Sequence, residues 1–271
     1  MADVALLEVA DRVAVVTMNR PGARNALNAE LRRAIPELVA LADADPEVAV
    51  IVLTGADPAF CAGLDLKELG RDGGPLQPAG GEMPASGRLG GAERAFSGSR
   101  ASMLPTAKPV VGAVNGVAVT GGLELALHCD FLVASERARF ADTHGRIGVQ
   151  PAWGMTVLLP QAVGLRRARE MSTTGNYVDA HTALAWGLVN HVVPHEELLP
   201  FARALASDIA SNDADTLRTL LATYDEGSRG TVAEAWQVEG RAFRAWQRER
   251  IDPAEIERRR RGVVERGRSQ V

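Results

Sequence analysis

The chain has 271 residues, a formal net charge of −4, and a composition of 46% hydrophobic and 24% charged residues. These values are typical of folded globular proteins and exclude the disordered and fibrous classes. The negative net charge does not favour binding to nucleic acid, so no nucleic-acid partner is expected. We interpret the one basic stretch, "ERRRRGVVERGRSQV" at the C-terminus, as a solvated helix end rather than a phosphate-binding arm.

The N-terminus and the cysteines bear on cellular location. "MADVALLEVADRVAVV" lacks the basic region, apolar region and cleavage site of a secretory signal. The most apolar stretch, 110–127, is interrupted by Asn115 and Glu124, so we expect no membrane span. Cys61 and Cys129 are too few for a disulfide framework and have no metal-ligand spacing. We therefore expect a cytoplasmic protein with reduced thiols and no membrane partner.

The first elements along the chain are predicted to be a β-hairpin and a helix. "ALLEVA" and "RVAVVTMN" are β-rich runs divided by Asp11 and Arg12. A helical pattern follows from Asn28, which is a typical N-cap residue, to about Ala44. Pro36 lies inside this pattern and is expected to kink or split the helix.

Strands and helices then alternate. "VAVIVLTG", "PVVGAVNG" and "DFLVAS" are apolar runs of strand length, each next to a helix-like stretch. This alternation predicts an α/β architecture. The β-rich runs stop after about residue 195, so we divide the chain into a core at 1–195 and a C-terminal helical region at 196–271.

Two regions outside this pattern suggest roles of their own. Residues 70–91 contain eight glycines and three prolines, which predicts a long loop that is either a mobile cover of a binding site or an insertion without a role. Trp236, Phe243 and Trp246 share one face of a C-terminal helix. That face packs into a core or forms a subunit interface, and we favour the interface because so small a helical region has little core of its own.

The stretch "GVAVTGGLELALHCD" places Glu124 shortly after Gly121 and Gly122. If a helix begins at Gly121, the N–H groups of its first turn stabilise negative charge, and Glu124 faces the same space. Carboxylates in a first turn are often only partners of the helix dipole. The apolar residues before Glu124 nevertheless predict burial and a raised pKa, which favours a role in proton transfer.

A second cluster, "DPAFCAGLDLKEL", directly follows a predicted buried strand. The Ala62–Gly63 pair either turns an amide into the same cavity or is an ordinary turn between a strand and a helix. Cys61 is expected to be a small buried residue. Neither cluster by itself specifies a reaction.

Together these motifs resemble the crotonase, or enoyl-CoA hydratase/isomerase, superfamily over nearly the whole chain. The matching segments, in their usual order, are "NRPGARNALN", "FCAGLDLKEL", "KPVVGAVNGVAVTGGLELALHCD", "ARFAD" and "TGNYVDAHTALAWGLVNHVV". The resemblance implies an α/β fold, a crotonase-like spiral of ββα repeats with a C-terminal helical trimerisation region. In this family such trimers often pair into hexamers.

The resemblance also implies the residues of the site. The amides of Ala62 and Gly121 would form an oxyanion hole that holds the thioester oxygen while an enolate forms. Glu124 would handle a water molecule and the proton at the α-carbon. The residues whose backbone would grip coenzyme A are Ala23, Arg24, Leu64, Asp65 and Leu66.

The chain departs from the family pattern at the second hydratase glutamate. That residue normally follows the first by twenty positions, where this chain has His144. His144 either replaces the glutamate as acid or base, steered by Asp142, or is a hydrogen-bonded structural residue. Trp153 stands near a turn that is glycine-rich in the family, and it either narrows the acyl pocket or fills the core. His128 is expected to have a packing role.

The resemblance therefore implies an acyl-CoA enzyme, foremost an enoyl-CoA hydratase that adds water to a 2-enoyl-CoA. Coenzyme A enters as part of the substrate, and no metal or redox cofactor is expected, because two amides suffice to stabilise the enolate. One alternative is an enoyl-CoA isomerase with Glu124 as its single base. The other is an acyl-CoA-binding protein without catalytic activity.

Overall fold

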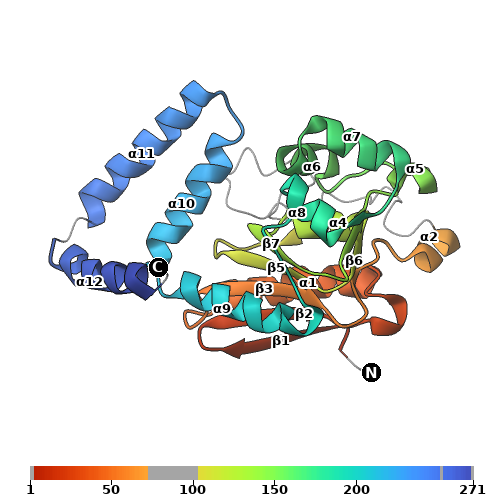
Figure 1. The fold of residues 1–271 in the computed structure, drawn as a ribbon, viewed down its shortest axis with the longest axis horizontal. Coiled ribbons are helices and arrows are strands. Elements are labelled where there is room, and N and C mark those ends of the chain that lie inside the picture. The colour runs from red at the N-terminus through yellow and green to blue at the C-terminus, as the bar shows by residue number, and fades with distance from the viewer. Residues whose placement is uncertain (1–2, 73–102, 251–252, 270–271) are drawn as a thin grey trace. The chain divides into compact units, whose positions relative to one another are not determined.

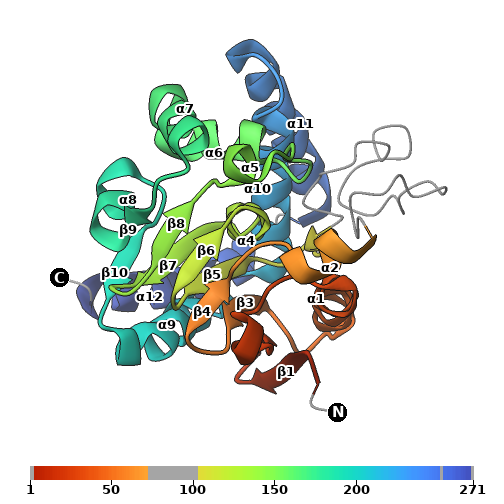
Figure 2. The same ribbon diagram turned by 90° about the vertical axis from the view of Figure 1, so that its right-hand side faces the viewer.

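The computed structural model describes residues 3–72, 103–250 and 253–269. The chain forms two compact units, Met1–Arg218 and Thr219–Val271. Within the described residues the first unit contains every strand, and the second consists of helices (Figure 1, Figure 2).

Two β-sheets form the frame of the first unit. One has the strand order β1-β2-β3-β5-β7-β10, in which β1 and β2 are antiparallel and the other neighbours are parallel. The other has the order β4-β6-β8-β9. The strands are β1 (Ala5–Ala10), β2 (Val13–Met18), β3 (Val50–Gly55), β4 (Ala59–Cys61), β5 (Val110–Val114), β6 (Val117–Val119), β7 (Phe131–Ser135), β8 (Arg139–Ala141), β9 (Val178–Asp179) and β10 (His191–Val193).

Three successive ββα repeats connect the two sheets, which confirms the fold that the sequence implied. In each repeat the first strand joins the larger sheet and the second strand joins the smaller one. The repeats are β3-β4-α2, β5-β6-α4 and β7-β8-α5, with helices α2 (Leu66–Asp72), α4 (Gly121–Leu127) and α5 (His144–Ile147). The other helical segments of this unit are η1 (Pro21–Ala23), α1 (Ala29–Ala44), α6 (Met155–Val163), α7 (Leu165–Thr174), α8 (Ala180–Trp186), η4 (His195–Glu197) and α9 (Leu198–Ala210).

The N-terminal elements form as predicted, with one difference. Asp11 and Arg12 make the hairpin turn between β1 and β2 at positive φ angles of 49° and 65°. The side chain of Asn28 caps α1 by accepting a hydrogen bond from its first turn. α1 runs through Pro36 as one helix and is not split. Its buried face continues on both sides of the proline, and burial of several such side chains offsets the roughly 3 kcal/mol that an internal proline costs.

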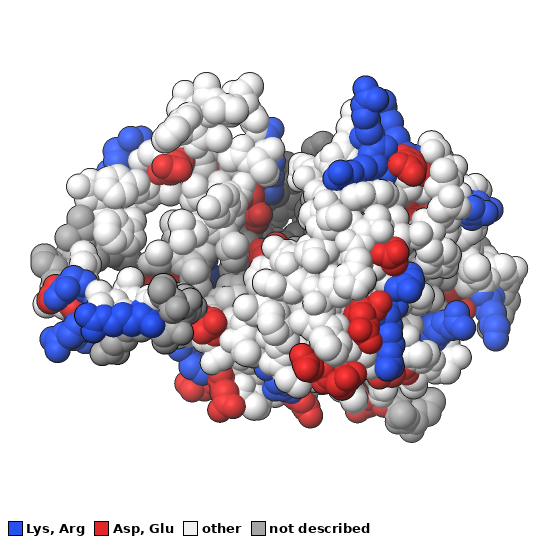
Figure 3. All heavy atoms as spheres, in the orientation of Figure 1, with Lys and Arg blue, Asp and Glu red and all other residues white. Residues whose placement is uncertain are grey.

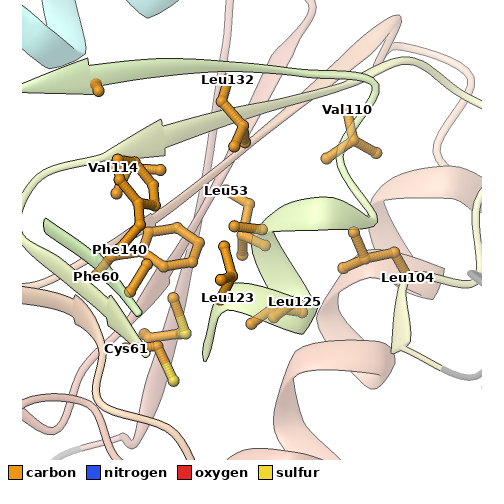
Figure 4. Packing of buried hydrophobic residues seen from close by; sticks show 14 of the residues in the cluster. Leu53, Phe60, Cys61, Leu104, Val110, Val114, Leu123, Leu125, Leu132 and Phe140 are labelled. Carbon is orange, nitrogen blue, oxygen red and sulfur yellow. The ribbon is translucent and has the colours of Figure 1, made fainter. Parts of the chain in front are cut away.

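The main core fixes α4, the helix that carries Glu124. Leu123 and Leu125 of α4 are fully buried in the same cluster as Leu53 of β3 and Phe140 of β8 (Figure 4). Each buried leucine contributes about 1.5–3 kcal/mol relative to an exposed one. The backbone around Glu124 is therefore held between two anchored neighbours.

The core unit extends beyond the boundary predicted at residue 195. α9 packs on the larger sheet, where its side chains share an apolar cluster with β2, β3, β5 and β7 (Figure 1). The face it buries is made of Leu198, Ala202, Ala206 and Ala210. The predicted boundary lies before this helix, whereas the compact unit ends at Arg218 within α10.

The second unit presents apolar side chains on its surface. It contains most of α10 (Ala214–Gly227), together with α11 (Val232–Arg250) and α12 (Pro253–Ser269). Trp236 and Phe243 of α11 are 70% and 56% exposed. The ring of Phe243 stacks on Trp246 with centroids 6.0 Å apart. These residues lie on one helix with little cover from their own unit.

The basic tail forms α12, and Figure 3 shows basic side chains gathered over this helix. Arg258 and Arg259 both form ion pairs with Glu255, and Arg260 pairs with Glu257. These pairs lie one turn apart along the helix, which is how an exposed helix face is stabilised in water. The arrangement agrees with a solvated helix end.

Two further predictions concern the long loop and membrane spans. The long loop at 70–91 begins inside α2, which ends at Asp72, and the rest of it lies outside the described residues. In the described part of the chain, no helix combines the length and the apolar character needed to cross a membrane.

Candidate active site

Three parallel strand ends bring the candidate site together. A turn follows β4, α4 begins directly after β6, and a short segment follows β8. The strands are parallel neighbours, so these three segments emerge at the same edge of the smaller sheet. A Cβ placed on Gly63 would lie 3.5 Å from the amide nitrogen of Gly121, and Thr120 Oγ1 lies 2.6 Å from Thr143 Oγ1. All three segments therefore meet.

Glu124 lies in the first turn of α4 with only 1% of its surface exposed. Its Oε1 accepts hydrogen bonds from the backbone N–H groups of Trp153 at 2.9 Å and Met155 at 3.2 Å. Burial raises the pKa of Glu124, and the hydrogen bond from Trp153 and the nearby His144 only partly oppose this. The predicted burial and raised pKa are both confirmed. Oε2 makes no hydrogen bond within the described residues and is the oxygen that faces His144.

His144 begins α5 and is also buried. Its Nδ1 lies 2.7 Å from Asp142 Oδ1, and its Nε2 lies 3.7 Å from Glu124 Oε2. The pKa of Asp142 is lowered although burial tends to raise it, because hydrogen bonds from His144 and from the Ser172 side chain favour the carboxylate. The His144 imidazole thus lies between two carboxyl groups, within hydrogen-bond distance of Asp142 and beyond that distance from Glu124.

The double glycine allows two close approaches to α4. A Cβ on Gly122 would collide with the carbonyl oxygen of Cys61, so glycine lets β4 pack against the helix start. A Cβ on Gly121 would lie 2.9 Å from the ring of Trp153. Trp153 is only half-buried, and its ring lies next to Gly121 while packing against the main apolar cluster. Its carbonyl oxygen accepts a hydrogen bond from His128 Nε2 at 2.7 Å, which gives His128 the structural role expected for it.

The turn after β4 differs from the prediction in one residue. The Ala62 N–H donates to Arg24 O at 3.0 Å, so the donor that the sequence assigned to the oxyanion hole is already used. Within the described residues, the N–H groups of Leu64 and Gly121 form no backbone hydrogen bond. Glycine at position 63 allows this turn. Its φ of +87° disfavours residues with a side chain, and a Cβ on it would lie only 2.7 Å from Val119 O.

The two segments predicted to grip coenzyme A lie side by side. The hydrogen bond between Ala62 and Arg24 joins them at one point, and Leu27 N donates to Gly63 O at 2.7 Å at another. Arg20 and Asp65 form an ion pair at 3.1 Å across the same two segments. Ala23 ends η1, Leu64 is half-buried, and Leu66 is 55% exposed at the start of α2. The residues predicted to contact coenzyme A therefore lie on two adjoining segments of backbone.

Several residues that shape the site escaped the sequence analysis. Thr120 has a φ of 53°, which is a strained value for a β-branched residue, and it hydrogen-bonds to Thr143. Buried Asn25 donates to Ala56 O and Ala59 O and so holds the segment around Ala23 and Arg24 against β4. Ser172 reaches Asp142 from α7. The position of Thr120 directly before a double glycine is a sequence signal that could have identified it. The contacts of Asn25 and Ser172 arise only in the tertiary structure, so no sequence pattern indicates them.

The remaining candidate groups are the Cys61 thiol and side chains of metal-binding type. Burial raises the pKa of the Cys61 thiol to about 12, so it is a packing residue as predicted. In the part of the chain that the structure describes, no group of three or more His, Cys, Asp or Glu side chains could hold a metal ion.

Comparisons with known proteins bear on the family to which the chain belongs. A model of the family described as enoyl-CoA hydratase/isomerase matches residues 8–260. The chain is similar to a "Probable enoyl-CoA hydratase" of Rhizobium meliloti (strain 1021), with 36% identity over 240 residues that cover 89% of this chain and 88% of that protein. It is also similar to the "Crotonyl-CoA hydratase" of Syntrophomonas wolfei, with 35% identity over 239 residues that cover 88% of this chain and 87% of that protein.

A similar solved structure is that of an enoyl-CoA hydratase from Mycobacterium tuberculosis H37Rv, with a TM-score of 0.71 and 46% identity over 89% of this chain and 98% of that one. The family match spans both compact units, and the sequence relatives cover most of both chains. The chain belongs to the enoyl-CoA hydratase/isomerase family.

Proposed function

We propose that this protein is an enoyl-CoA hydratase that adds water across the double bond of a 2-enoyl-CoA. The observation that carries the proposal is the pair formed by Glu124 and His144. Two buried proton-transfer groups stand 3.7 Å apart beside the start of α4, and one of them has a raised pKa. The relatives named as hydratases support the same reaction.

In this proposal two amides hold the thioester oxygen. Gly121 N–H is one donor, as the sequence predicted. Leu64 N–H is the second donor in place of Ala62, because the Ala62 N–H is bonded to Arg24 O. Donors aimed at the developing enolate oxygen stabilise the transition state more than the ground state.

The proton balance follows from the pair. Glu124 and His144 together hold one movable proton. One member takes a proton from water, whose oxygen forms a bond to the β-carbon, and the electrons of the double bond move into the enolate. The other member then delivers its proton to the α-carbon, so the pair again holds one proton at the end of the cycle.

A direct assay of the protein with matched substrates tests the proposal. Loss of the 2-enoyl thioester with formation of the 3-hydroxyacyl-CoA is the expected result. Movement of a double bond without addition of water would instead support the isomerase with Glu124 as its single base. Tight binding of acyl-CoA without any turnover would support a binding protein, and either result would contradict the hydratase.

We infer that coenzyme A lies along the strip formed by Ala23, Arg24 and the turn from Leu64 to Leu66, with the acyl group toward Trp153. A thioester should then bind more tightly than its free acid, which calorimetry measures. Equal affinity for the two would contradict this placement. The absence of a metal or redox cofactor and the cytoplasmic location stay predictions.

We also propose that the exposed apolar face of α11 assembles the protein into a homotrimer or a hexamer of paired trimers. Trp236 and Phe243 are largely exposed within their own unit, and large apolar patches of this kind commonly mark interfaces. Full-length protein with Trp236→Glu and Phe243→Glu should have a lower mass by light scattering than the unmodified protein. An unchanged mass would remove this face from the interface.

A further inference from the structure

Asp142 has a specific relation to His144 that the hydratase proposal does not use. Its Oδ1 lies 2.7 Å from His144 Nδ1 and also accepts a hydrogen bond from the His144 backbone N–H at 3.2 Å. Both side chains are at most 7% exposed. A single carboxylate oxygen of Asp142 therefore contacts both Nδ1 and the backbone N–H of His144.

This contact determines which ring nitrogen carries the proton. An ionised carboxylate can only accept hydrogen bonds, so His144 Nδ1 must donate to it. The low pKa of Asp142 keeps it ionised near neutral pH. The neutral imidazole then has its lone pair on Nε2, the atom that points toward Glu124 Oε2.

The charged groups that face His144 come from two neighbouring segments. Glu124 faces it from α4, and Asp142 faces it from the segment after β8. On α7, Ser172 meets Asp142 through its hydroxyl. Arg146 of α5 directs its guanidinium to the carbonyl oxygens of Thr174 and Gly175.

We infer that Asp142 is a positioning residue, which keeps one proton of His144 on Nδ1 and so leaves Nε2 and Glu124 Oε2 to exchange the single movable proton of the reaction. This inference rests on the proposed hydratase function. Asp142 itself neither gains nor loses a proton in the cycle. A carboxyl group in place of the neutral imidazole of His144 would bring its own negative charge to the shared proton. Asp142 supplies that negative charge instead.

The first test reads the tautomer in the unmodified protein. Nitrogen NMR of protein labelled with 15N-histidine distinguishes a protonated Nδ1 from a protonated Nε2, and loss of a signal in His144→Gln assigns it among the five histidines. The expected result is a protonated Nδ1 at neutral pH. A neutral His144 with its proton on Nε2 would overturn the inference, whether or not the protein is a hydratase.

The second test uses Asp142→Asn in the hydratase assay. The expected kcat falls by about 10- to 100-fold or more with little change in KM, by analogy with the carboxylates that orient a histidine in metal sites. Removing the negative charge makes the Glu124–His144 pair bind each of its protons less tightly. Both limbs of the pH–rate profile should therefore move to lower pH by about one unit or more.

Two controls separate this role from a structural one. Asp142→Glu keeps the carboxylate and should recover part of kcat and the original pH profile. Asp57→Asn removes the carboxylate from another histidine, His195, and should change neither. A lower kcat in Asp142→Asn with an unmoved pH profile, or an unchanged kcat, would overturn the inference. An unmodified protein without hydratase activity would instead contradict the proposed function, and the NMR result would still decide the tautomer.

Discussion

In the described residues of the first unit, two clusters in which a histidine meets a carboxylate differ in whether a ring nitrogen is left unbonded. In the candidate site, His144 is hydrogen-bonded to Asp142 through Nδ1, and its Nε2 lies 3.7 Å from Glu124 Oε2, which is too far for a hydrogen bond. In the second cluster, His195 is bonded on both sides, by Ser135 Oγ and Asp57 Oδ2, each at 3.0 Å. Of these two imidazoles, the first keeps a ring nitrogen available and the second does not.

The two clusters also differ in burial. Glu124 and His144 have side-chain exposures of 2% and 7%, whereas the Asp57 side chain is 62% exposed. Charged groups interact more strongly when they are buried away from bulk water, whereas water screens an exposed pair. Residue type alone therefore does not identify a proton-transfer site. The unfilled nitrogen and the low exposure are what distinguish the candidate site from the second cluster.

The largest expected effect is that of Glu124→Gln on turnover. Glutamine keeps an oxygen for the N–H groups of Trp153 and Met155 but cannot take a proton, so kcat should fall about 100-fold or more with substrate binding little changed. Steady-state kinetics and calorimetry measure the two quantities. Turnover at the level of the unmodified protein would contradict the assigned role of Glu124.

A matched pair of histidine variants sharpens the comparison. His144→Ala should lower kcat by a similar order, about 100-fold. His195→Ala should leave kcat unchanged and instead lower the free energy of unfolding by about 1–3 kcal/mol, because it removes the hydrogen bonds to Ser135 and Asp57. Equal kinetic losses in the two variants would mean that His144 has no special place in the reaction.

Replacing His144 with a second glutamate tests how the negative charges in the site affect turnover. His144→Glu brings a third carboxyl group into contact with Asp142, and buried like charges oppose ionisation. We expect kcat about 10-fold below the unmodified protein, with recovery when Asp142→Asn is added, as for coupled neighbouring groups. If the added substitution lowers kcat further, the two positions are not linked through charge.

The smallest expected effects are on stability and have opposite signs in the two clusters. Burial raises the pKa of Glu124 in the folded protein above its ordinary value of 4.5. Ionisation of Glu124 therefore lowers the free energy of unfolding as the pH rises from 4.5 through the raised pKa. Glu124→Gln should therefore be more stable than the unmodified protein at neutral pH, by about 1 kcal/mol, and this gain should vanish below about pH 4.

Asp57 is the opposite case. Partial burial tends to raise its pKa, but hydrogen bonds from Asn115 and His195 hold it below the ordinary value of 3.8. Its ionised form stabilises the fold above that ordinary value, and the contribution is lost as pH falls through the lowered pKa. Because the side chain is largely exposed, Asp57→Asn should cost less than about 1 kcal/mol at neutral pH. Denaturant unfolding at several pH values measures both variants, and a stabilising Asp57→Asn would contradict the comparison.

The parts of the fold that the sequence predicted are those set by local patterns. Continuous apolar runs at β3, β5 and β7 specify strands buried on both faces, and Asn28 specifies a helix start. The burial of Glu124 followed from the same local evidence, since apolar residues surround it in the sequence. The boundary predicted after residue 195 lies before α9, which is helical like the tail, and only its buried Ala202, Ala206 and Ala210 face marks it as part of the core.

The finer geometry of the site depends on contacts that no local pattern encodes. Whether Ala62 or Leu64 presents its N–H is decided by the positive φ of Gly63 and by the hydrogen bond from Ala62 to Arg24. The pairing of His195 with Asp57 joins residues 138 positions apart. The position of His144 as a partner of Glu124 was reached through family resemblance, since strands β7 and β8 separate the two residues in the sequence.

The central claim is that Glu124 and His144 act as one unit that shares a single proton, and a double-mutant cycle tests it most directly. kcat is measured for Glu124→Gln, His144→Ala and the double variant with the same 2-enoyl-CoA. Groups that act as a unit give losses that do not multiply, so the double variant should be about as slow as the slower single variant, roughly 100-fold below the unmodified protein. A double variant slowed by the product of the two losses, about 10,000-fold, would show that the two groups act independently and would contradict the claim.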